Sequence, residues 1–114
     1  MEERGVQNPR VVDLIRPDAA ADAVELTMLE TRAWGSDPLQ LDQLEGKFNA
    51  YLGYVQGGYL ARDYPDYAGK RVRFRLACAA PPVGEAGRML AAMRDFAERE
   101  GIGFVVEVGA FASP

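Results

Sequence analysis

Three arginines that alternate along one short segment are the residues of this chain best suited to bind a charged ligand. They are Arg71, Arg73 and Arg75 in the segment KRVRFRLA, and an apolar residue separates each from the next. Successive side chains of a β-strand point to opposite faces, so a strand here would carry three guanidinium groups in a row. Because the guanidinium fork suits phosphate and carboxylate groups, the row predicts an anion-binding surface as one interpretation.

Acidic residues on the other expected strands favour a second interpretation of this row. Asp13, Glu25 and Glu107 could each lie on the same sheet face as the arginines. Opposite charges on neighbouring strands stabilise a sheet by about 0.2–1 kcal/mol per pair. We therefore expect a neutralised charge ladder in preference to an anion site.

The same sheet face is expected to carry apolar side chains as well. Depending on the strand register, it would gather some of Val11, Ile15, Leu29, Ala77 and Val105. A surface that mixes apolar, basic and acidic side chains is more typical of a protein interface than of a solvent-exposed face. We expect either a homodimer that pairs face to face or a complex with an unidentified protein partner.

All five tyrosines fall in one region of the chain, from Tyr51 to Tyr67. Their spacing places Tyr51 and Tyr59 in the apolar stripe of a helix, so we expect both in the core. Tyr54, Tyr64 and Tyr67 lie outside this stripe, and with the nearby arginines they could form a surface on which a base or a peptide stacks. Alternatively, these three rings only seal the edge of the core.

Small residues form a second stripe on the same expected helix. The stripe consists of Gly46, Ala50, Gly53 and Gly57. At about 100° per residue, it lies almost opposite the apolar stripe. An exposed helical glycine costs roughly 1 kcal/mol relative to alanine. Either the fold tolerates this cost, or the stripe lets another helix or backbone approach closely.

The residue types that most enzymes need are scarce. The chain has no histidine and one cysteine, Cys78, so neither a Cys–His pair nor a zinc site can form within it. Its few serines and threonines show no nucleophile-elbow pattern, and there is no phosphate-binding loop. We expect no catalytic residue, no cofactor and no metal ion. Only carboxylate, tyrosine or arginine chemistry would be open to an enzyme.

Composition indicates a cytoplasmic protein. The 114 residues carry a formal net charge of −4, which disfavours a general nucleic-acid binder. A single cysteine cannot form an internal disulfide, which suits a reducing compartment. The N-terminus begins with acids and lacks the apolar core that a signal peptide would have. The longest uncharged run, LACAAPPVG, is too short to span a bilayer.

Hydrophobic patterns predict four strands and two helices. The strands are expected at 11–16, 24–30, 70–78 and 103–108, and the second helix at about 84–100. For the first helix, Asp37 fits the N-cap, Pro38 the first helical position and Gln40 a capping box.

This ββαβαβ order predicts a two-layer α+β sandwich, with a four-stranded mixed sheet and both helices on one face. We expect one domain at 10–109, between a flexible leader at 1–9 and a tail at 110–114.

Several short motifs together resemble a known family. They are VDLI at 12–15, Trp34, the pattern LxxKxNxYL at 44–52, and Tyr64-Pro65. The most specific part is the central pattern, which is matched by Leu44, Lys47, Asn49, Tyr51 and Leu52. The combination resembles a family of small, stand-alone bacterial proteins catalogued as a domain of unknown function. The resemblance implies one compact domain and supplies no catalytic residue.

Three functions remain open at this point. The first is a non-enzymatic protein-interaction module, of the adaptor or immunity-protein kind, that self-associates or binds a protein partner. The second is a domain that binds an anionic ligand (a nucleotide, an acidic metabolite or single-stranded nucleic acid) through the arginine-bearing sheet face. The third, an enzyme, has the least support from the residues. We favour the interaction module.

Overall fold

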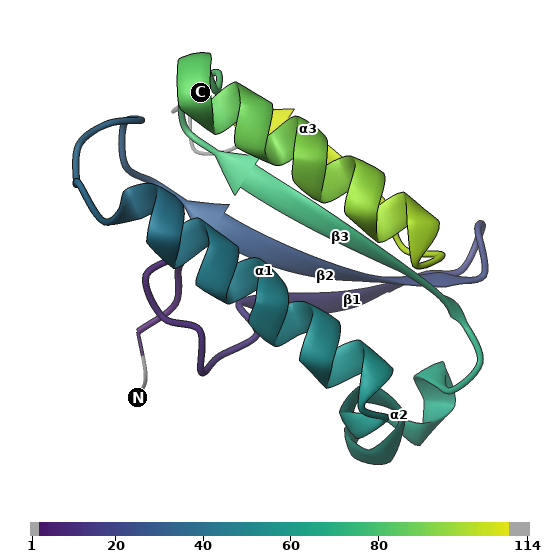
Figure 1. Cartoon of the computed structure of the whole chain (residues 1–114). Helices are drawn as coiled ribbons and strands as arrows, with labels where there is room; N and C mark the ends of the chain where they lie inside the picture. Colours follow the sequence, from purple (N-terminus) through teal and green to yellow (C-terminus); the bar gives the residue numbers. More distant parts are fainter. Residues whose placement is uncertain (1–2, 110–114) are drawn as a thin grey trace.

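The computed structural model describes residues 3–109 and contains one four-stranded sheet and two long helices (Figure 1). In chain order the elements are β1 (Leu14–Asp18), β2 (Ala23–Glu30), α1 (Gln40–Gln56), α2 (Tyr59–Asp63), the short 3-10 helix η1 (Pro65–Tyr67), β3 (Arg71–Cys78), α3 (Gly84–Arg99) and β4 (Gly103–Val108). The strand order in the sheet is β1-β2-β3-β4; β1 is antiparallel to β2, and the other neighbours are parallel. The predicted α+β class, mixed sheet and element order are confirmed, and the structure adds two short elements, α2 and η1, between α1 and β3.

Both long helices lie on the same side of the sheet (Figure 1). The side chains below them follow the strand register, in which Leu26, Phe74 and Phe104 are neighbours on adjacent strands. The ring of Phe48 on α1 packs edge-on against Phe74 at 6.0 Å and Phe104 at 5.8 Å between centroids. This alternation leaves the other set of strand residues on the opposite face, which we call the open face.

The first strand begins three residues later than predicted. Asp13 ends the irregular segment, because its carboxylate accepts hydrogen bonds from the backbone N–H groups of Gly5 and Leu29. A side chain therefore occupies the place on β2 that a strand partner would otherwise take. Pro17 lies within β1, which its position at the sheet edge permits.

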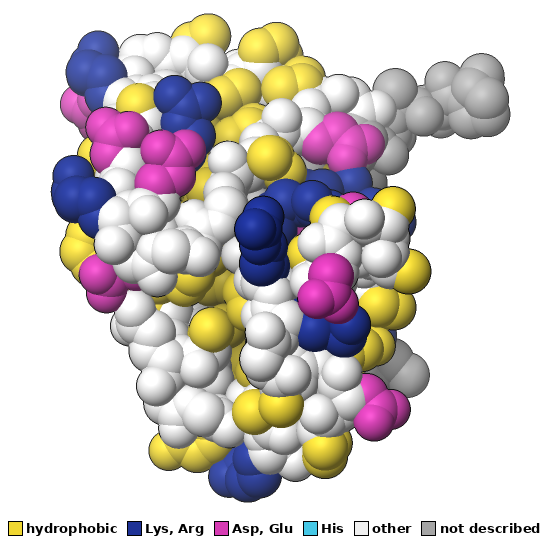
Figure 2. Space-filling model, turned by 90° about the vertical axis from the view of Figure 1, so that its right-hand side faces the viewer, with side chains coloured by type: hydrophobic (Ala, Val, Ile, Leu, Met, Phe, Trp, Pro, Cys, Tyr) yellow, Lys and Arg dark blue, Asp and Glu magenta, His cyan; other side chains and the backbone are white. Residues whose placement is uncertain are grey.

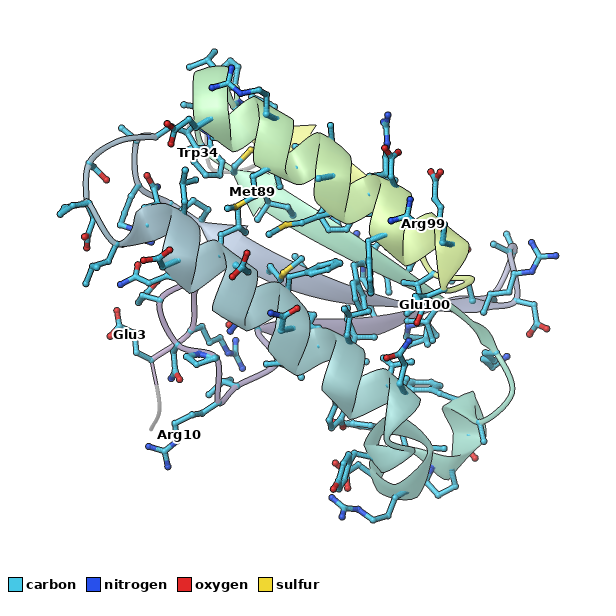
Figure 3. All side chains as sticks on the ribbon, in the orientation of Figure 1. Glu3, Arg10, Trp34, Met89, Arg99 and Glu100 are labelled. Carbon is cyan, nitrogen blue, oxygen red and sulfur yellow. The ribbon has the colours of Figure 1, made fainter. Side chains whose placement is uncertain are left out.

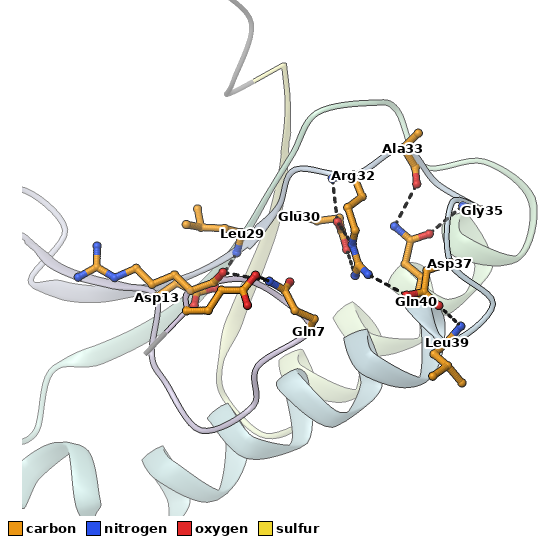
Figure 4. Close-up of polar contacts among 12 residues, drawn as sticks. Gln7, Asp13, Leu29, Glu30, Arg32, Ala33, Gly35, Asp37, Leu39 and Gln40 are labelled. Carbon is orange, nitrogen blue, oxygen red and sulfur yellow. Dashed lines mark hydrogen bonds and ion pairs between the residues drawn. The ribbon is translucent and has the colours of Figure 1, made fainter. Parts of the chain in front are cut away.

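The start of α1 also differs from the prediction. The helix begins at Gln40 rather than at Pro38, and Asp37 caps only locally by accepting a hydrogen bond from the N–H of Leu39. The predicted capping box is wrong because the Gln40 side chain turns back to the preceding loop, where it bonds Ala33 O and Gly35 N–H (Figure 4). The loop and the helix are thus tied together by one buried amide.

Part of the segment expected to be a flexible leader runs beside β2. Val6 is fully buried, and its N–H donates to Leu29 O at 2.8 Å. The predicted tail at 110–114 lies outside the described residues. In the described part of the chain, no helix has the length and apolar character needed to cross a membrane.

Candidate functional site

The three arginines of β3 lie on the open face, and a buried acid stands at the centre of the charges there. The carboxylate of Glu25 accepts hydrogen bonds from Arg16 at 3.1 Å and from Arg73 at 2.8 Å, and it lies 3.6 Å from the Nε of Arg75. The register explains this, since Arg16, Glu25 and Arg73 are neighbours across β1, β2 and β3. One carboxylate therefore serves three guanidinium groups.

Two further acids complete this charge network. Arg73 also pairs with Asp18 at 3.3 Å, and its hydrogen bond holds the pKa of that carboxyl below its ordinary value. Arg75 pairs with Glu107 on β4. Three carboxylates thus meet three guanidinium groups, the pattern of a neutralised ladder. Figure 2 shows acidic and basic side chains interspersed on the side of the molecule that it presents.

Three residues considered for the open face, Val11, Asp13 and Ile15, lie elsewhere, and Val11 precedes β1. Asp13 precedes β1 and is buried beneath α1. Ile15 pairs in register with Leu26 and so faces the helices, while its neighbour Leu14 lies on the open face. All three differences follow from the predicted start of the first strand. Arg71 is exposed at the beginning of β3. The pKa of Asp22 is lowered mainly by the hydrogen bond from Lys70, and the charge of Arg71 lowers it further.

A buried ion pair connects the N-terminal segment to α1. The ammonium of Lys47 donates to Asp13 Oδ1 at 2.8 Å, to Asn8 O at 2.6 Å and to Val11 O at 2.6 Å. All three of its N–H groups are used, and neither charged side chain has exposed surface. This is the arrangement in which a buried charge is tolerated.

Tyr51 extends this network to the sheet. Its hydroxyl accepts the N–H of Asp13 at 2.8 Å and donates to Thr27 O at 2.6 Å, and burial raises the pKa of the phenol well above its ordinary value. Lys47, Tyr51 and Asp13 belong to the motifs that carried the family resemblance. Sequence reasoning missed their contact, although a lysine within the apolar stripe of α1 was a usable signal.

Tyr54, Tyr64 and Tyr67, the three tyrosines predicted to lie outside the apolar stripe, line one cleft, which we call the tyrosine cleft. It has a volume of about 680 Å³ and lies between the segment before and within β1 and the α1–α2–η1 region. The lining residues are Arg4, Pro9, Arg10, Val11, Val12, Asp13, Leu14, Ile15, Ala50, Tyr51, Tyr54, Tyr64 and Tyr67. The arginines beside these tyrosines are therefore Arg4 and Arg10, and not the arginines of β3. Figure 3 shows Arg10 on the N-terminal segment with its side chain directed outward.

The rings of this cleft are held in fixed positions. Tyr64 and Tyr67 stack with centroids 5.5 Å apart and planes 19° apart. The hydroxyl of Tyr54 donates to Asp63 at 2.9 Å, and burial together with this bond raises the pKa of Tyr54 to about 12. The prediction that Tyr59 is in the core is wrong: it is 48% exposed and packs against the guanidinium of Arg62.

The three glycines of the small-residue stripe are exposed. A methyl group added at Gly46 or Gly53 would meet no atom within 4 Å, whereas one at Gly57 would lie 2.7 Å from Gly53 O. Ala50 is half-buried and lines the tyrosine cleft. A role for the stripe in close approach of another chain stays a prediction.

The edge strand β4 exposes apolar side chains on both of its faces. Val105, Val106 and Val108 are 43%, 37% and 47% exposed. Beside β4 runs a groove of about 450 Å³, formed with α3 and lined by Pro82, Gly87, Leu90, Ala91, Arg94, Phe104, Val105 and Val106. Nothing in the sequence indicates which strand forms this edge, because strand order follows from tertiary pairing.

Among residues 3–109, no group of three or more His, Cys, Asp or Glu side chains is placed to hold a metal ion. Cys78 is buried, and burial raises the pKa of its thiol, which keeps the thiolate nucleophile scarce at neutral pH.

The comparisons with known proteins identify a family and no function. The model of a family of unknown function (DUF6572) matches residues 4–110, which include the region of the predicted resemblance. No curated protein and no solved structure matches the chain.

Proposed function

Because the chain belongs to DUF6572, a family of unknown function, we propose its function from its surface: a protein-interaction module that pairs with a second copy of itself through β4. The observation that carries the proposal is the apolar edge of this strand, with which no other strand within residues 3–109 pairs and where three valines are more than one-third exposed. Natural sheets rarely leave such an edge unprotected, because it pairs readily with another strand.

The two edges of this sheet differ in the protection that they carry. β1 contains Pro17, which cannot donate a backbone hydrogen bond, and charged residues on either side of it. β4 contains no proline or lysine, and its single charged residue, Glu107, is already paired with Arg75. The protection of one edge and the absence of protection at the other support β4 as the contact surface.

The backbone of β4 suits pairing with a second copy. The N–H of Gly109 donates to Cys78 O on β3, and hydrogen bonding alternates along a strand. Phe104, Val106 and Val108 therefore direct their N–H and C=O groups to the free edge. An antiparallel pairing centred on Val106 would place Phe104 opposite Val108 of the second copy and satisfy these groups in both chains.

The layer above β4 also permits this pairing. On α3, the side facing the groove carries Gly87 and Ala91, one turn apart, and Arg94. An antiparallel pairing about Val106 would bring the two α3 helices alongside each other over the joined sheet. Small side chains at Gly87 and Ala91 allow a close approach there. The contact would then combine backbone hydrogen bonds with apolar burial in two layers.

The open face gives less support to an interaction or to anion binding. Arg73 and Arg75 already pair with carboxylates, so a phosphate would have to displace Glu25, Asp18 or Glu107. Charged groups that are satisfied within one chain gain little from a second partner. We therefore place the contact at the sheet edge and not on the face.

The test is the mass of the protein in solution by light scattering. The chain mass is 12.5 kDa, so the proposal predicts twice that value, 25 kDa. Val106→Lys should give the monomer mass, since two lysines would meet at the centre of the pairing. Val83→Lys, at a residue that is 69% exposed outside β4, is the matched control and should stay dimeric. A wild-type monomer at about 100 μM would contradict the proposal.

A further inference from the structure

A second surface on this molecule has the size and the preformed walls of a small-molecule site. The tyrosine cleft has a volume of about 680 Å³, and such sites typically measure roughly 300–1,000 Å³. It lies along β1, at the opposite edge of the sheet from β4. Binding there would therefore be independent of pairing through β4.

One wall of the cleft is fixed by the buried ion pair. Lys47 holds the backbone at Asn8 and Val11 with hydrogen bonds of 2.6 Å, and it holds the side chain of Asp13. Val11, Val12 and Ile15 then present apolar surface to the cleft. A wall built in this way needs no ordering when a ligand binds, which removes one of the main costs of association.

The opposite wall consists of aromatic rings. Tyr64 and Tyr67 are stacked on each other, and Tyr54 is oriented by its bond to Asp63. Tyr64 is 43% exposed, so a large part of its apolar ring is available to a ligand. Rigid, partly exposed rings are a suitable platform for a planar π-system.

Charge at the lining of the cleft is positive. Arg4 and Arg10 both line it, and among residues 3–109 the carboxylate that lines it, Asp13, is already neutralised by Lys47. The nearby carboxylate of Asp63 is occupied by Tyr54 and Arg62. Arginine pairs with phosphate and carboxylate groups in preference to neutral ones.

We propose that the tyrosine cleft binds a planar aromatic compound that carries a phosphate or carboxylate group. The ring would stack on Tyr64, against the apolar wall at Val12, and the anionic group would pair with Arg4 at the mouth of the cleft. Both parts of the ligand contribute, so neither the ring alone nor the anion alone is sufficient.

The probes are adenosine monophosphate and indole-3-acetate, titrated into the ¹⁵N-labelled full chain and followed by amide NMR shifts. Binding should shift the amides of Tyr54, Tyr64 and Tyr67. Adenosine without its phosphate, and inorganic phosphate alone, should bind at least about tenfold more weakly than the nucleotide. Stronger binding by the nucleotide indicates a phosphate ligand, and stronger binding by indole-3-acetate indicates a carboxylate ligand.

Variants separate the cleft from the rest of the surface. Tyr64→Ala and Arg4→Gln should each weaken binding at least about tenfold. Tyr59→Ala is the matched control for the ring, because Tyr59 is similarly exposed and does not line the cleft. Arg88→Gln, on the exposed side of α3, is the control for the charge. Both controls should bind as the wild type does, and the amide spectrum of each variant reports that it is folded.

Three results would overturn the proposal. The first is the absence of amide shifts in the cleft with both probes up to about 5 mM. The second is equal binding of adenosine and its monophosphate together with unchanged binding by Arg4→Gln, since the arginine would then have no role. The third is binding that survives Tyr64→Ala with the amide shifts located elsewhere.

Discussion

The ammonium of Lys47 lies 2.8 Å from the carboxylate of Asp13, and neither side chain reaches solvent. This pair joins α1 to a segment more than thirty residues earlier in the chain. It also places Asp13 where its other oxygen accepts the N–H of Leu29 on β2. The N-terminal segment is thereby attached to both layers of the fold at a single point.

Removing the cation should destabilise the fold strongly. Lys47→Met keeps the length of the side chain but leaves the Asp13 carboxylate buried without a counter-ion, which typically costs about 3–5 kcal/mol. Denaturant unfolding followed by circular dichroism measures the change. Lys70→Met is the matched control, because its partner Asp22 is largely exposed and water can replace the lysine. An equal loss in both variants would contradict the importance of the buried pair.

The hydroxyl of Tyr51 should make stability depend on alkaline pH. A tyrosine ionises near pH 10 when the chain is unfolded, whereas burial raises the pKa of folded Tyr51 above that value. Above about pH 10 the unfolded chain therefore loses a proton that the folded chain retains, and stability falls as pH rises, by up to about 1.4 kcal/mol per unit.

Comparison with Tyr51→Phe isolates this effect. The variant should be less stable at neutral pH, because Asp13 N–H and Thr27 O lose their buried partner at a cost of about 1–3 kcal/mol. Between about pH 10 and 11.5 its stability should fall less steeply than that of the wild type. Urea unfolding across this range provides the measurement, and parallel curves for the two proteins would exclude Tyr51 as the titrating group.

Glu25 should control whether the arginines of the open face can bind anions. Glu25→Gln removes the carboxylate shared by Arg16, Arg73 and Arg75 and should destabilise the fold by about 2 kcal/mol. Phosphate should then raise the melting temperature of the variant more than that of the wild type, since the guanidinium groups have lost their internal partner.

Thermal unfolding with and without phosphate at constant ionic strength tests this prediction. Glu107→Gln is the matched control, because it removes an acid of the same face that is about half exposed and serves only Arg75. If phosphate raised the melting temperature of the wild type as much as it raised that of Glu25→Gln, the internal acids would not neutralise the arginines of the open face. The anion-binding interpretation of the arginines would then be favoured.

The sequence predicts the fold better than it predicts the site, for reasons that particular residues make clear. Alternation in KRVRFRLA predicts β3 and its two faces, because Phe74 and Leu76 must be buried whatever the strand order. The same rule fails for Asp13, because alternation applies only inside a strand and β1 begins at Leu14, the residue after Asp13.

Long-range pairing limits the prediction of the site itself. Lys47 occupies a core position in the helical periodicity of α1, which signals a buried charge, but the periodicity does not name its partner. Tyr54, Tyr64 and Tyr67 can be grouped from the sequence alone, since they are close in the chain. Their arginine neighbours, Arg4 and Arg10, come from a distant segment, and only tertiary structure brings them to the cleft.

The glycine stripe on α1 yields a prediction in which two alternatives have opposite outcomes. Gly46→Ala and Gly53→Ala should each stabilise the chain by about 0.5–1 kcal/mol, because the added methyl group meets open space and alanine favours the helix. Gly57→Ala is the contrasting variant: its methyl group would lie 2.7 Å from Gly53 O, so it should destabilise. Denaturant unfolding measures all three changes.

If the stripe instead receives another helix, the double variant Gly46→Ala/Gly53→Ala should gain stability as a monomer but lose association by light scattering. A dimer unaffected by the double variant would leave β4 as the contact surface and make these glycines a tolerated cost.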